Sequence, residues 1–421
     1  MKQAVQIGAL SAANIGLAFL FQWLALTQLG PGVATDALFA GMTIPQLVLA
    51  VISGSLIHVL VPLLAGASEE RLHHDAWAFL VLISGLFSLL AVLLYILAPW
   101  WVPLIVPGFD AAGQALTIDI TRIQLIGMVF TAVNGVQWAF YQARQQFVWA
   151  EFTPILASAF ALLLLVWTLP KFGVIAAAWI STLRIGLQTL LIAPGMGKPV
   201  RPDMKSVAIR QAWLRIKPLL LGTAYYKTDP LVDRFLLSTA SSGSLSLYYL
   251  AQQIYGAVNE VLNKAIAAPL VPLLSKLYKA DDTAEFRQTY YKKMLQVAVT
   301  ALAGLLVLGM FGLTILGLLV ARGNITSDNI KELRWMMICL AGVFFGGAAG
   351  QICSSSFYAC GDTLTPTRMS MITYTAYIPA KVAAFYFYGV MGLAIITSIY
   401  YITNLSLQIY LFEKKLIIWA R

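Results

Sequence analysis

The sequence is poor in charged residues. Only 11% of its 421 residues are Asp, Glu, Lys or Arg, whereas a soluble domain carries about 25%. Hydrophobic residues make up 60% of the chain, and the mean hydropathy is +0.79. So few charged residues cannot form the water-exposed surface of a soluble protein of this size. The composition therefore excludes an ordinary soluble protein and favours one whose outer surface faces lipid.

Cysteine and histidine are also scarce, with three residues of each. Cys339, Cys353 and Cys360 lie in or beside one apolar stretch and form no C-x-x-C pair. This placement favours packing residues over a disulfide or a metal site.

Motifs of catalysis and nucleotide binding are absent as well. The sequence has no phosphate-binding loop, no H-E-x-x-H and no G-x-S-x-G, and it lacks the basic and aromatic pattern typical of nucleic-acid binding. We therefore expect no enzyme, no cofactor and no nucleic-acid partner. Transport by such a chain would draw on a coupling ion, the membrane potential or downstream consumption of its product.

What the sequence does have is long apolar stretches. A helix needs about 20 apolar residues to cross the hydrocarbon core of a bilayer. By that measure the chain is an all-α polytopic membrane protein with about 12 transmembrane helices. The first stretch runs past the length of a signal-peptide core, so we expect a helix there. The predicted spans are 5–28, 36–64, 75–100, 118–143, 150–169, 173–194, 214–238, 246–275, 294–320, 334–360, 367–388 and 390–412.

The net charge of +10 is unevenly distributed between the predicted loops. If the N-terminus is cytoplasmic, most Lys and Arg residues of the loops fall on the cytoplasmic side, as the positive-inside rule requires. The sequence therefore predicts a multi-pass membrane protein with both termini in the cytoplasm. The predicted outer segments hold only Lys171, Arg322, Lys331 and Arg334.

Short sequences recur in the two halves of the chain. LVPLL occurs at 60–64 and at 270–274, and Phe-Tyr occurs at 140–141 and at 357–358. Both members of each pair end a predicted helix, at the same place in a unit of six helices. Because six is an even number, two such units run through the membrane in the same direction.

The repeat predicts two parallel six-helix lobes around a central cavity. The first lobe is expected at 1–194 and the second at 214–421, joined by a basic cytoplasmic linker at 195–213. Two parallel lobes are typical of transporters that work by alternating access. A mixed-charge segment at 276–293 is expected to extend the eighth helix into the cytoplasm.

Ionisable side chains occur inside several predicted spans, where each needs a partner or a wet surface. Lys227, Asp229, Asp233 and Arg234 lie in the 214–238 span, just before or after Pro230. They either neutralise one another in pairs or line a hydrated cavity. A helix that faced only lipid would not tolerate them.

The 246–275 span carries a stripe of polar residues. Glu260 and Lys264 are four residues apart, which predicts an ion pair on one helix face, and Gln253 falls near the same stripe. Such a stripe is typical of cavity lining, and interhelical hydrogen bonding is the alternative.

Four further positions complete the predicted site. Asp36 is either a helix cap or a cavity residue, and Gln46 follows Pro45, which permits a bend. Arg184 and Lys381 are single cations in apolar helices, and either could meet a phosphate. The candidate cavity residues are Asp36, Gln46, Arg184, Lys227, Asp229, Asp233, Arg234, Gln253, Glu260, Lys264 and Lys381.

Several sequence blocks resemble those of one membrane protein family. The stretch ATDALF at 34–39, followed by IPQL at 44–47 and VPLL at 61–64, resembles the first-lobe signature of the MurJ/MviN family. These proteins are lipid II flippases of the multidrug/oligosaccharidyl-lipid/polysaccharide (MOP) exporter superfamily. Further similar blocks lie at 98–100, 107–109, 233–236, 243, 248–249, 271–275, 357–358 and 365–366.

The resemblance implies the MOP exporter fold, in which a hydrated cavity takes a pyrophosphate-sugar headgroup while the polyprenyl tail stays in lipid. It also implies that Asp36 is a cavity residue. Where the family places arginines in helices 1, 2 and 8, this chain has Phe21, Leu49 or Ala50, and Gln253. It also ends after the twelfth predicted helix, without the two further helices of the family.

These features together predict a flippase that moves an undecaprenyl-pyrophosphate-linked sugar intermediate from the cytoplasmic to the outer leaflet. The departures from the family leave an exopolysaccharide or O-antigen-type repeat unit in competition with lipid II. The alternative is a cation-coupled multidrug exporter of the same superfamily, for which the buried carboxylates would serve. The expected partners are the lipid-linked glycan, membrane lipids and glycan polymerase machinery.

Overall fold

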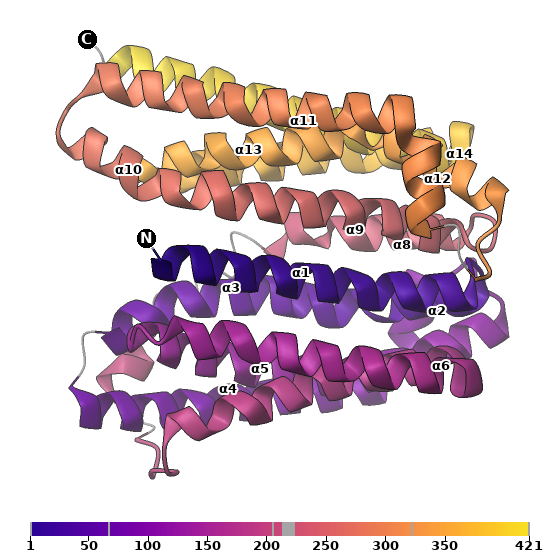
Figure 1. The fold of residues 1–421 in the computed structure, drawn as a ribbon, viewed down its shortest axis with the longest axis horizontal. Coiled ribbons are helices and arrows are strands. Elements are labelled where there is room, and N and C mark those ends of the chain that lie inside the picture. Colours follow the sequence, from indigo (N-terminus) through magenta and orange to yellow (C-terminus); the bar gives the residue numbers. More distant parts are fainter. Residues whose placement is uncertain (1, 66–67, 204–205, 213–223, 321–322, 420–421) are drawn as a thin grey trace. The chain divides into compact units, whose positions relative to one another are not determined.

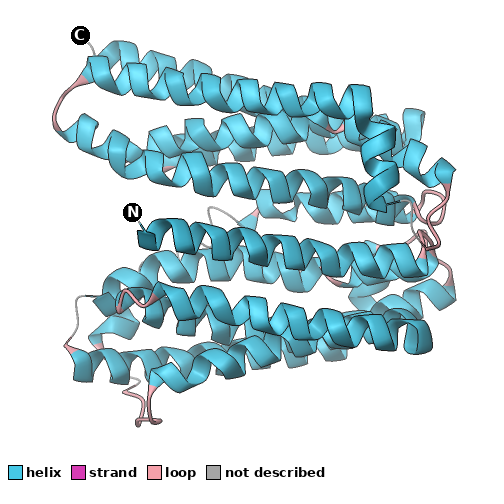
Figure 2. Cartoon of the chain, viewed as in Figure 1, coloured by secondary structure: helices cyan, strands magenta, loops and turns pink. Residues whose placement is uncertain are grey.

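The computed structural model describes all residues except 1, 66–67, 204–205, 213–223, 321–322 and 420–421. The described residues form helices joined by short loops, and no strand occurs among them (Figures 1 and 2). A lipid environment accounts for the all-helical structure, because only a structure that satisfies its own backbone hydrogen bonds can cross a bilayer. The chain folds as two compact units, 1–245 and 246–421.

The first unit is built around α5. This helix packs against α3, α4 and α6, and α6 also packs against α1. The buried core includes Phe79, Phe87 and Phe140. The helices of this unit are α1 (Lys2–Leu29), α2 (Val33–Gly41), α3 (Thr43–Ala65), α4 (Glu69–Ile105), α5 (Ala111–Ala143), α6 (Phe147–Ile192) and α8 (Asp229–Ser238), with the 3-10 turns η1 (Ala193–Met196) and η2 (Tyr226–Thr228).

Hydrogen bonds between polar side chains and backbone carbonyls join α5 to α6. Gln137 donates to the carbonyl of Thr189 at 3.2 Å, and the Tyr141 hydroxyl donates to the carbonyl of Ile192 at 3.0 Å. Such bonds hold helices together where lipid supplies no competing donors. Leu104 and Leu163, in contrast, are more than 70% exposed, as expected of side chains that face lipid.

The second unit is arranged around α13, which packs against α10, α11 and α14. Its core contains an aromatic cluster of Phe286, Tyr290, Phe357 and Phe412. The elements of this unit are α9 (Ser244–Leu262, whose first two residues belong to the first unit), the π turn η3 (Asn263–Ala267), α10 (Ala268–Lys279), α11 (Thr283–Val320), α12 (Ser327–Cys339), α13 (Ala341–Ala359) and α14 (Leu364–Trp419).

Two of the long helices each contain two predicted spans. α6 is broken at Gly173 and α14 at Gly389, and both glycines have φ of 59°. A positive φ is readily available only to glycine. Eight described helices are long and apolar enough to cross a membrane, or nine if α12 and α13, which meet at 43°, form one span. The multi-pass membrane fold is therefore confirmed.

The predicted helix at 36–64 is interrupted at Met42, three residues before its proline. The chain leaves α2 at Gly41 and enters α3 at Thr43. Pro45 has no N–H to donate to the carbonyl of Gly41, and its ring crowds that carbonyl. The side chain of Thr43 instead donates to the carbonyl of Phe39 at 3.1 Å.

Two other predictions of continuous helix are wrong. The predicted span 214–238 is interrupted by η2, and α8 begins only at Asp229; Pro230 in its first turn cannot extend a preceding helix. Residues 214–223 lie outside the described part. The segment at 276–293 does not extend one helix either, because α10 ends at Lys279 and Asp281 takes a φ of 56° before α11 begins.

Small residues let α13 approach α14 closely. A Cβ atom built on Gly342 would lie 2.6 Å from the carbonyl oxygen of Ser398, and one on Gly346 would lie 2.9 Å from the carbonyl carbon of Tyr401. The Gly342 N–H also donates to Ser398 Oγ at 3.1 Å. Glycines spaced by four residues are a common helix-packing device in membranes.

The turn between α13 and α14 is fixed by a carboxylate. Asp362 accepts hydrogen bonds from the backbone N–H of Thr365 at 3.0 Å and from Lys415 at 3.0 Å. Burial raises the pKa of Asp362, but the hydrogen bonds from Thr365 and Lys415 outweigh burial. The net effect lowers this pKa below its ordinary value of 3.8.

We predict that Gly342→Ala destabilises the protein by about 1–3 kcal/mol, because the added methyl group overpacks the α13–α14 contact. The fraction of detergent-solubilised protein that stays monodisperse after heating measures this loss. Gly350→Ala is the matched control in the same helix, since nothing lies within 4 Å of a Cβ atom there. Equal melting of the two variants would contradict the close approach.

A second prediction concerns pH. Because the folded-state pKa of Asp362 is lowered, its stabilising effect is complete above its ordinary pKa and is lost as the pH falls toward the lowered value. Asp362→Asn should therefore melt at a lower temperature than the wild type at pH 6, and the difference should shrink at pH 3. A difference that stays constant over this range would show that the Asp362 charge does not stabilise the turn.

Candidate functional site

Asp36 lies near the start of α2 but does not cap it. The N-cap residue is Gly32, and the hydroxyl of Thr35, three residues later, accepts from the N–H of Gly32 at 3.0 Å and donates to the carbonyl of Gly30 at 2.9 Å. The Asp36 side chain is 3% exposed, and its Oδ2 accepts from the backbone N–H of Gly243 at 2.7 Å. Asp36 therefore joins two segments that are 207 residues apart in the sequence.

Tight backbone packing surrounds this contact. Gly243 has φ of 91°, and a Cβ atom there would lie 3.0 Å from Pro31. The N–H of Gly108 donates to Ser238 Oγ at 3.2 Å, and a Cβ atom on Gly108 would lie 2.3 Å from the carbonyl oxygen of Ser238. We call these residues, together with Asp36, the Asp36 cluster. Its members come from three loop regions that the charge distribution predicts to lie outside the cell.

A cavity of about 120 Å³ lies at the break between α2 and α3. Pro45 and Gln46 line it from the start of α3, and further lining residues come from α1, α5 and α6. We call it the Arg184 pocket. The residues that line it are Ala18, Phe21, Gln22, Met42, Pro45, Gln46, Leu49, Gln124, Gly127, Met128, Thr131, Ser181, Arg184 and Ile185.

The polar lining of the Arg184 pocket is held from several helices. Arg184 Nη1 donates to Ser158 Oγ at 3.4 Å. Gln124 donates to Ser181 Oγ at 2.7 Å and to the carbonyl of Ala178 at 3.3 Å, which fixes its amide. The structure thus brings together two predicted site residues, Arg184 and Gln46.

Three further lining residues were not predicted. Gln22, Gln124 and Ser181 are polar residues within long apolar stretches. Each is a single neutral residue, so composition alone gave no reason to select it. The signal lies in their combination on neighbouring helices, which appears only when α1, α5 and α6 are packed.

The charged residues before and within α8 differ in their surroundings. Lys227 is exposed in η2, Asp229 is partly buried, and Asp233 and Arg234 are only 1% and 3% exposed. The face of α8 that carries Asp233 and Arg234 therefore turns into protein. This placement agrees with the expectation that the helix does not face lipid alone.

The predicted site residues of the second unit do not form one group among the described interactions. Lys264 Nζ lies 3.6 Å from Glu260 Oε1, so the predicted ion pair is present, with both side chains close to half exposed. The pair spans the start of η3, and Gln253 lies earlier on α9, partly buried. Lys381 is 1% exposed, and its Nζ lies 5.9 Å from the centroid of the Tyr400 ring.

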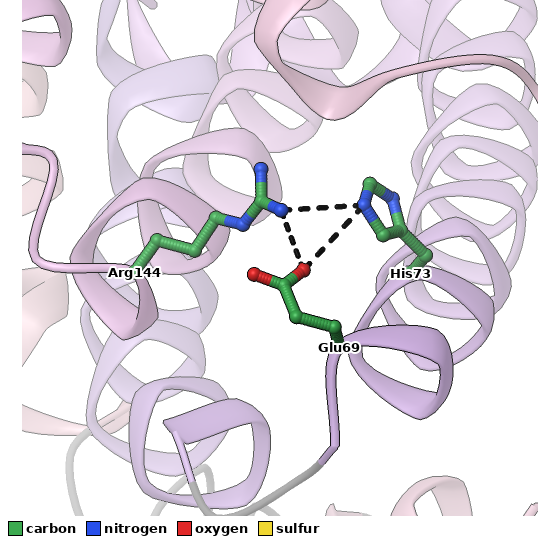
Figure 3. A network of polar contacts seen from close by, with 3 residues as sticks. All are labelled: Glu69, His73 and Arg144. Carbon is green, nitrogen blue, oxygen red and sulfur yellow. Dashed lines mark hydrogen bonds and ion pairs between the residues drawn. The ribbon is translucent and has the colours of Figure 1, made fainter.

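A second polar cluster lies at the C-terminal end of α5 and has a structural role. Arg144 donates to Glu69, and His73 Nε2 lies 3.9 Å from the same carboxylate oxygen (Figure 3). The Arg144 guanidinium also lies over the ring of Phe140, 5.0 Å from its centroid. These contacts connect the first turns of α4 to the end of α5.

Comparison with known proteins gives a consistent result. The family model described as lipid II flippase MurJ matches residues 26–420. A probable lipid II flippase MurJ of Buchnera aphidicola is 21% identical over 99% of this chain and 84% of its own length. That of Vibrio cholerae is 25% identical over 71% of this chain, which spans only 59% of the Vibrio protein.

Solved structures agree on the fold. A lipid II flippase MurJ in an inward closed conformation superposes with a TM-score of 0.83 at 16% identity, covering 97% of this chain and 87% of that one. An inward-facing multidrug resistance MATE family transporter of the MOP superfamily gives 0.77 at 16% identity over 99% of both chains. The chain therefore has the MOP exporter fold.

We predict that Asp36→Asn loosens the segment around Gly243. An ionised acceptor forms a stronger hydrogen bond than a neutral one, so amide exchange at 238–244 should accelerate on the order of tenfold or more. Hydrogen–deuterium exchange mass spectrometry of the full chain in lipid nanodiscs measures this. Asp328→Asn, at an exposed ion pair with Lys331, should leave that peptide unchanged. Unaltered exchange in Asp36→Asn would mean that the contact does not hold the segment.

Proposed function

The chain belongs to the MurJ family of lipid II flippases, and on this premise we propose that it moves an undecaprenyl-pyrophosphate-linked sugar intermediate across the bacterial inner membrane. The observation that carries the proposal is the family match over residues 26–420. A flippase moves its lipid between leaflets and leaves every bond intact, so the chain is a transporter and not an enzyme.

The physical problem for such a transporter is the headgroup. A pyrophosphate-linked sugar carries charge and many hydroxyl groups, and its transfer through hydrocarbon without partners is prohibitively costly. The protein must offer cations and amides along the path while the apolar tail remains in lipid. The Arg184 pocket, with its guanidinium and amides, supplies groups of this kind within the first unit.

Transport by alternating access also requires contacts that close and open. The Asp36 cluster is closed in this structure, and it lies in loops that the charge distribution predicts to be outside. We propose that these contacts separate when the headgroup is released to the outer leaflet. A charged hydrogen bond of this kind, supported by glycine packing, is weak enough to be broken in each cycle.

The finer features of the function are also proposed here. Both termini lie in the cytoplasm, and the driving force is the membrane potential or a coupling ion, since the sequence carries no nucleotide-binding motif. Phe21 and Leu49, where the family resemblance suggests arginines, line the Arg184 pocket. The substrate is therefore either lipid II or another polyprenyl-pyrophosphate-linked repeat unit, delivered to a glycan polymerase.

A vesicle assay tests this function. The full chain is reconstituted into liposomes that contain fluorescent lipid II or a fluorescent undecaprenyl-pyrophosphate-linked repeat unit, and an external quencher reports the accessible fraction. We expect protein-dependent flipping of at least one of the two, with a rate that rises under an imposed membrane potential or ion gradient. Asp36→Asn should change the rate, whereas Asp328→Asn should not. Rates equal to those of empty liposomes for both lipids would overturn the proposal.

A further inference from the structure

We propose that the Arg184 pocket is a phosphate-binding subsite, which holds one phosphate group of the lipid-linked substrate within the first unit. This inference rests on the proposed function, but its chemistry is set by the pocket itself. Four features support it: the sign of the charge, the available donors, the size of the cavity and its open side.

The charge is the first feature. Among the described residues that line the pocket, Arg184 is the charged one, and no carboxylate lines it. A guanidinium stays protonated in proteins, and a positive charge inside an apolar helix is costly unless an anion or water compensates it. Within the described part of the chain, its contact is the neutral hydroxyl of Ser158 at 3.4 Å. The pocket therefore favours an anion.

The donors are the second feature. Arg184 presents a planar fork of N–H groups suited to phosphate oxygens. The amides of Gln22 and Gln46 lie in the same lining. Gln22 Oε1 is buried and has no hydrogen-bond partner among the described residues. An amide can exchange its oxygen and nitrogen positions by rotation, so an anion in the pocket allows Gln22 to donate through its NH₂ group.

Size and access are the third and fourth features. The cavity of about 120 Å³ is several times the roughly 30 Å³ that one water occupies in the liquid. It is well below the roughly 300–1,000 Å³ of pockets that enclose drug-sized ligands. Gln46 is exposed at one side, so a phosphate can enter while a sugar or a lipid tail stays outside. These dimensions suit one phosphate group and not a drug.

The binding test uses purified full-length protein in nanodiscs and radiolabelled inorganic pyrophosphate. We expect Arg184→Gln to weaken binding by about tenfold or more, because it removes a charge-assisted hydrogen bond. Arg184→Lys should recover only part of the affinity, since it lacks the fork. Arg122→Gln is the matched control, because Arg122 pairs with Asp119 outside the pocket. Equal affinity of the wild type and Arg184→Gln would overturn the proposal.

A second variant, at the exposed edge of the pocket, tests the proposal even if Arg184→Gln misfolds. Gln46→Glu places a carboxylate in the lining of the same pocket and should suppress pyrophosphate binding at least as strongly, while the exposed position preserves the fold. Retained binding in Gln46→Glu would count against the pocket even if Arg184→Gln could not be purified.

Competition identifies the source of the phosphate. Displacement of labelled pyrophosphate by undecaprenyl pyrophosphate, dependent on Arg184, supports a headgroup subsite. Binding that depends on Arg184 but resists the lipid would overturn the headgroup assignment and indicate a site for a free phosphate ion.

Flipping of the same variants separates this inference from the proposed function. If the wild type flips lipid and Arg184→Gln does so equally, with unchanged pyrophosphate affinity, the subsite is wrong and the function stands. If pyrophosphate binding depends on Arg184 but no lipid is flipped, the subsite stands and the function is wrong.

Discussion

Inside a bilayer, every backbone N–H and C=O must be hydrogen bonded by the protein, because lipid offers no partner. This constraint makes any interruption of a helix expensive unless protein or water covers it. Three of the interruptions described above lie close to polar side chains. The α2–α3 break lies beside Gln46, the η2 turn holds Lys227, and the π turn η3 holds Lys264. Irregular backbone and polar chemistry are therefore found at the same places, as expected where helices line something other than lipid.

The first unit combines two features that a flippase needs in separate places. The Asp36 cluster connects segments distant in the sequence through one buried carboxylate and two glycines, Gly108 and Gly243, whose neighbours leave little room for a side chain. The Arg184 pocket lies instead beside the interruption between α2 and α3, near Pro45. One site is closed by close packing and the other is an open cavity, and residues with unusual backbone properties lie at both.

The sequence predicted the all-α multi-pass membrane class, because this class depends on composition and on local patterns. It predicted the Glu260–Lys264 ion pair, because the two residues lie about one helical turn apart. It did not predict that Asp36 would bond to Gly243, because no local pattern encodes a partner so distant along the chain. The break before Asp229 was also missed, although Pro230 was a signal for it. The Arg184 pocket forms only where α1, α3, α5 and α6 pack together, and the hydropathy of the sequence does not predict that packing.

The two glycine breaks described in the long helices have a further consequence. Gly173 has φ and ψ of 59° and −147°, and Gly389 has 59° and −146°. Each stands between the last two apolar segments of its half of the chain. An agreement this close, at matching positions, is the trace expected from duplication and fusion of a gene that encoded half of the present protein. The ancestral product would have had to pair with a second copy of itself, and each copy would already have carried this glycine break between its last two apolar segments.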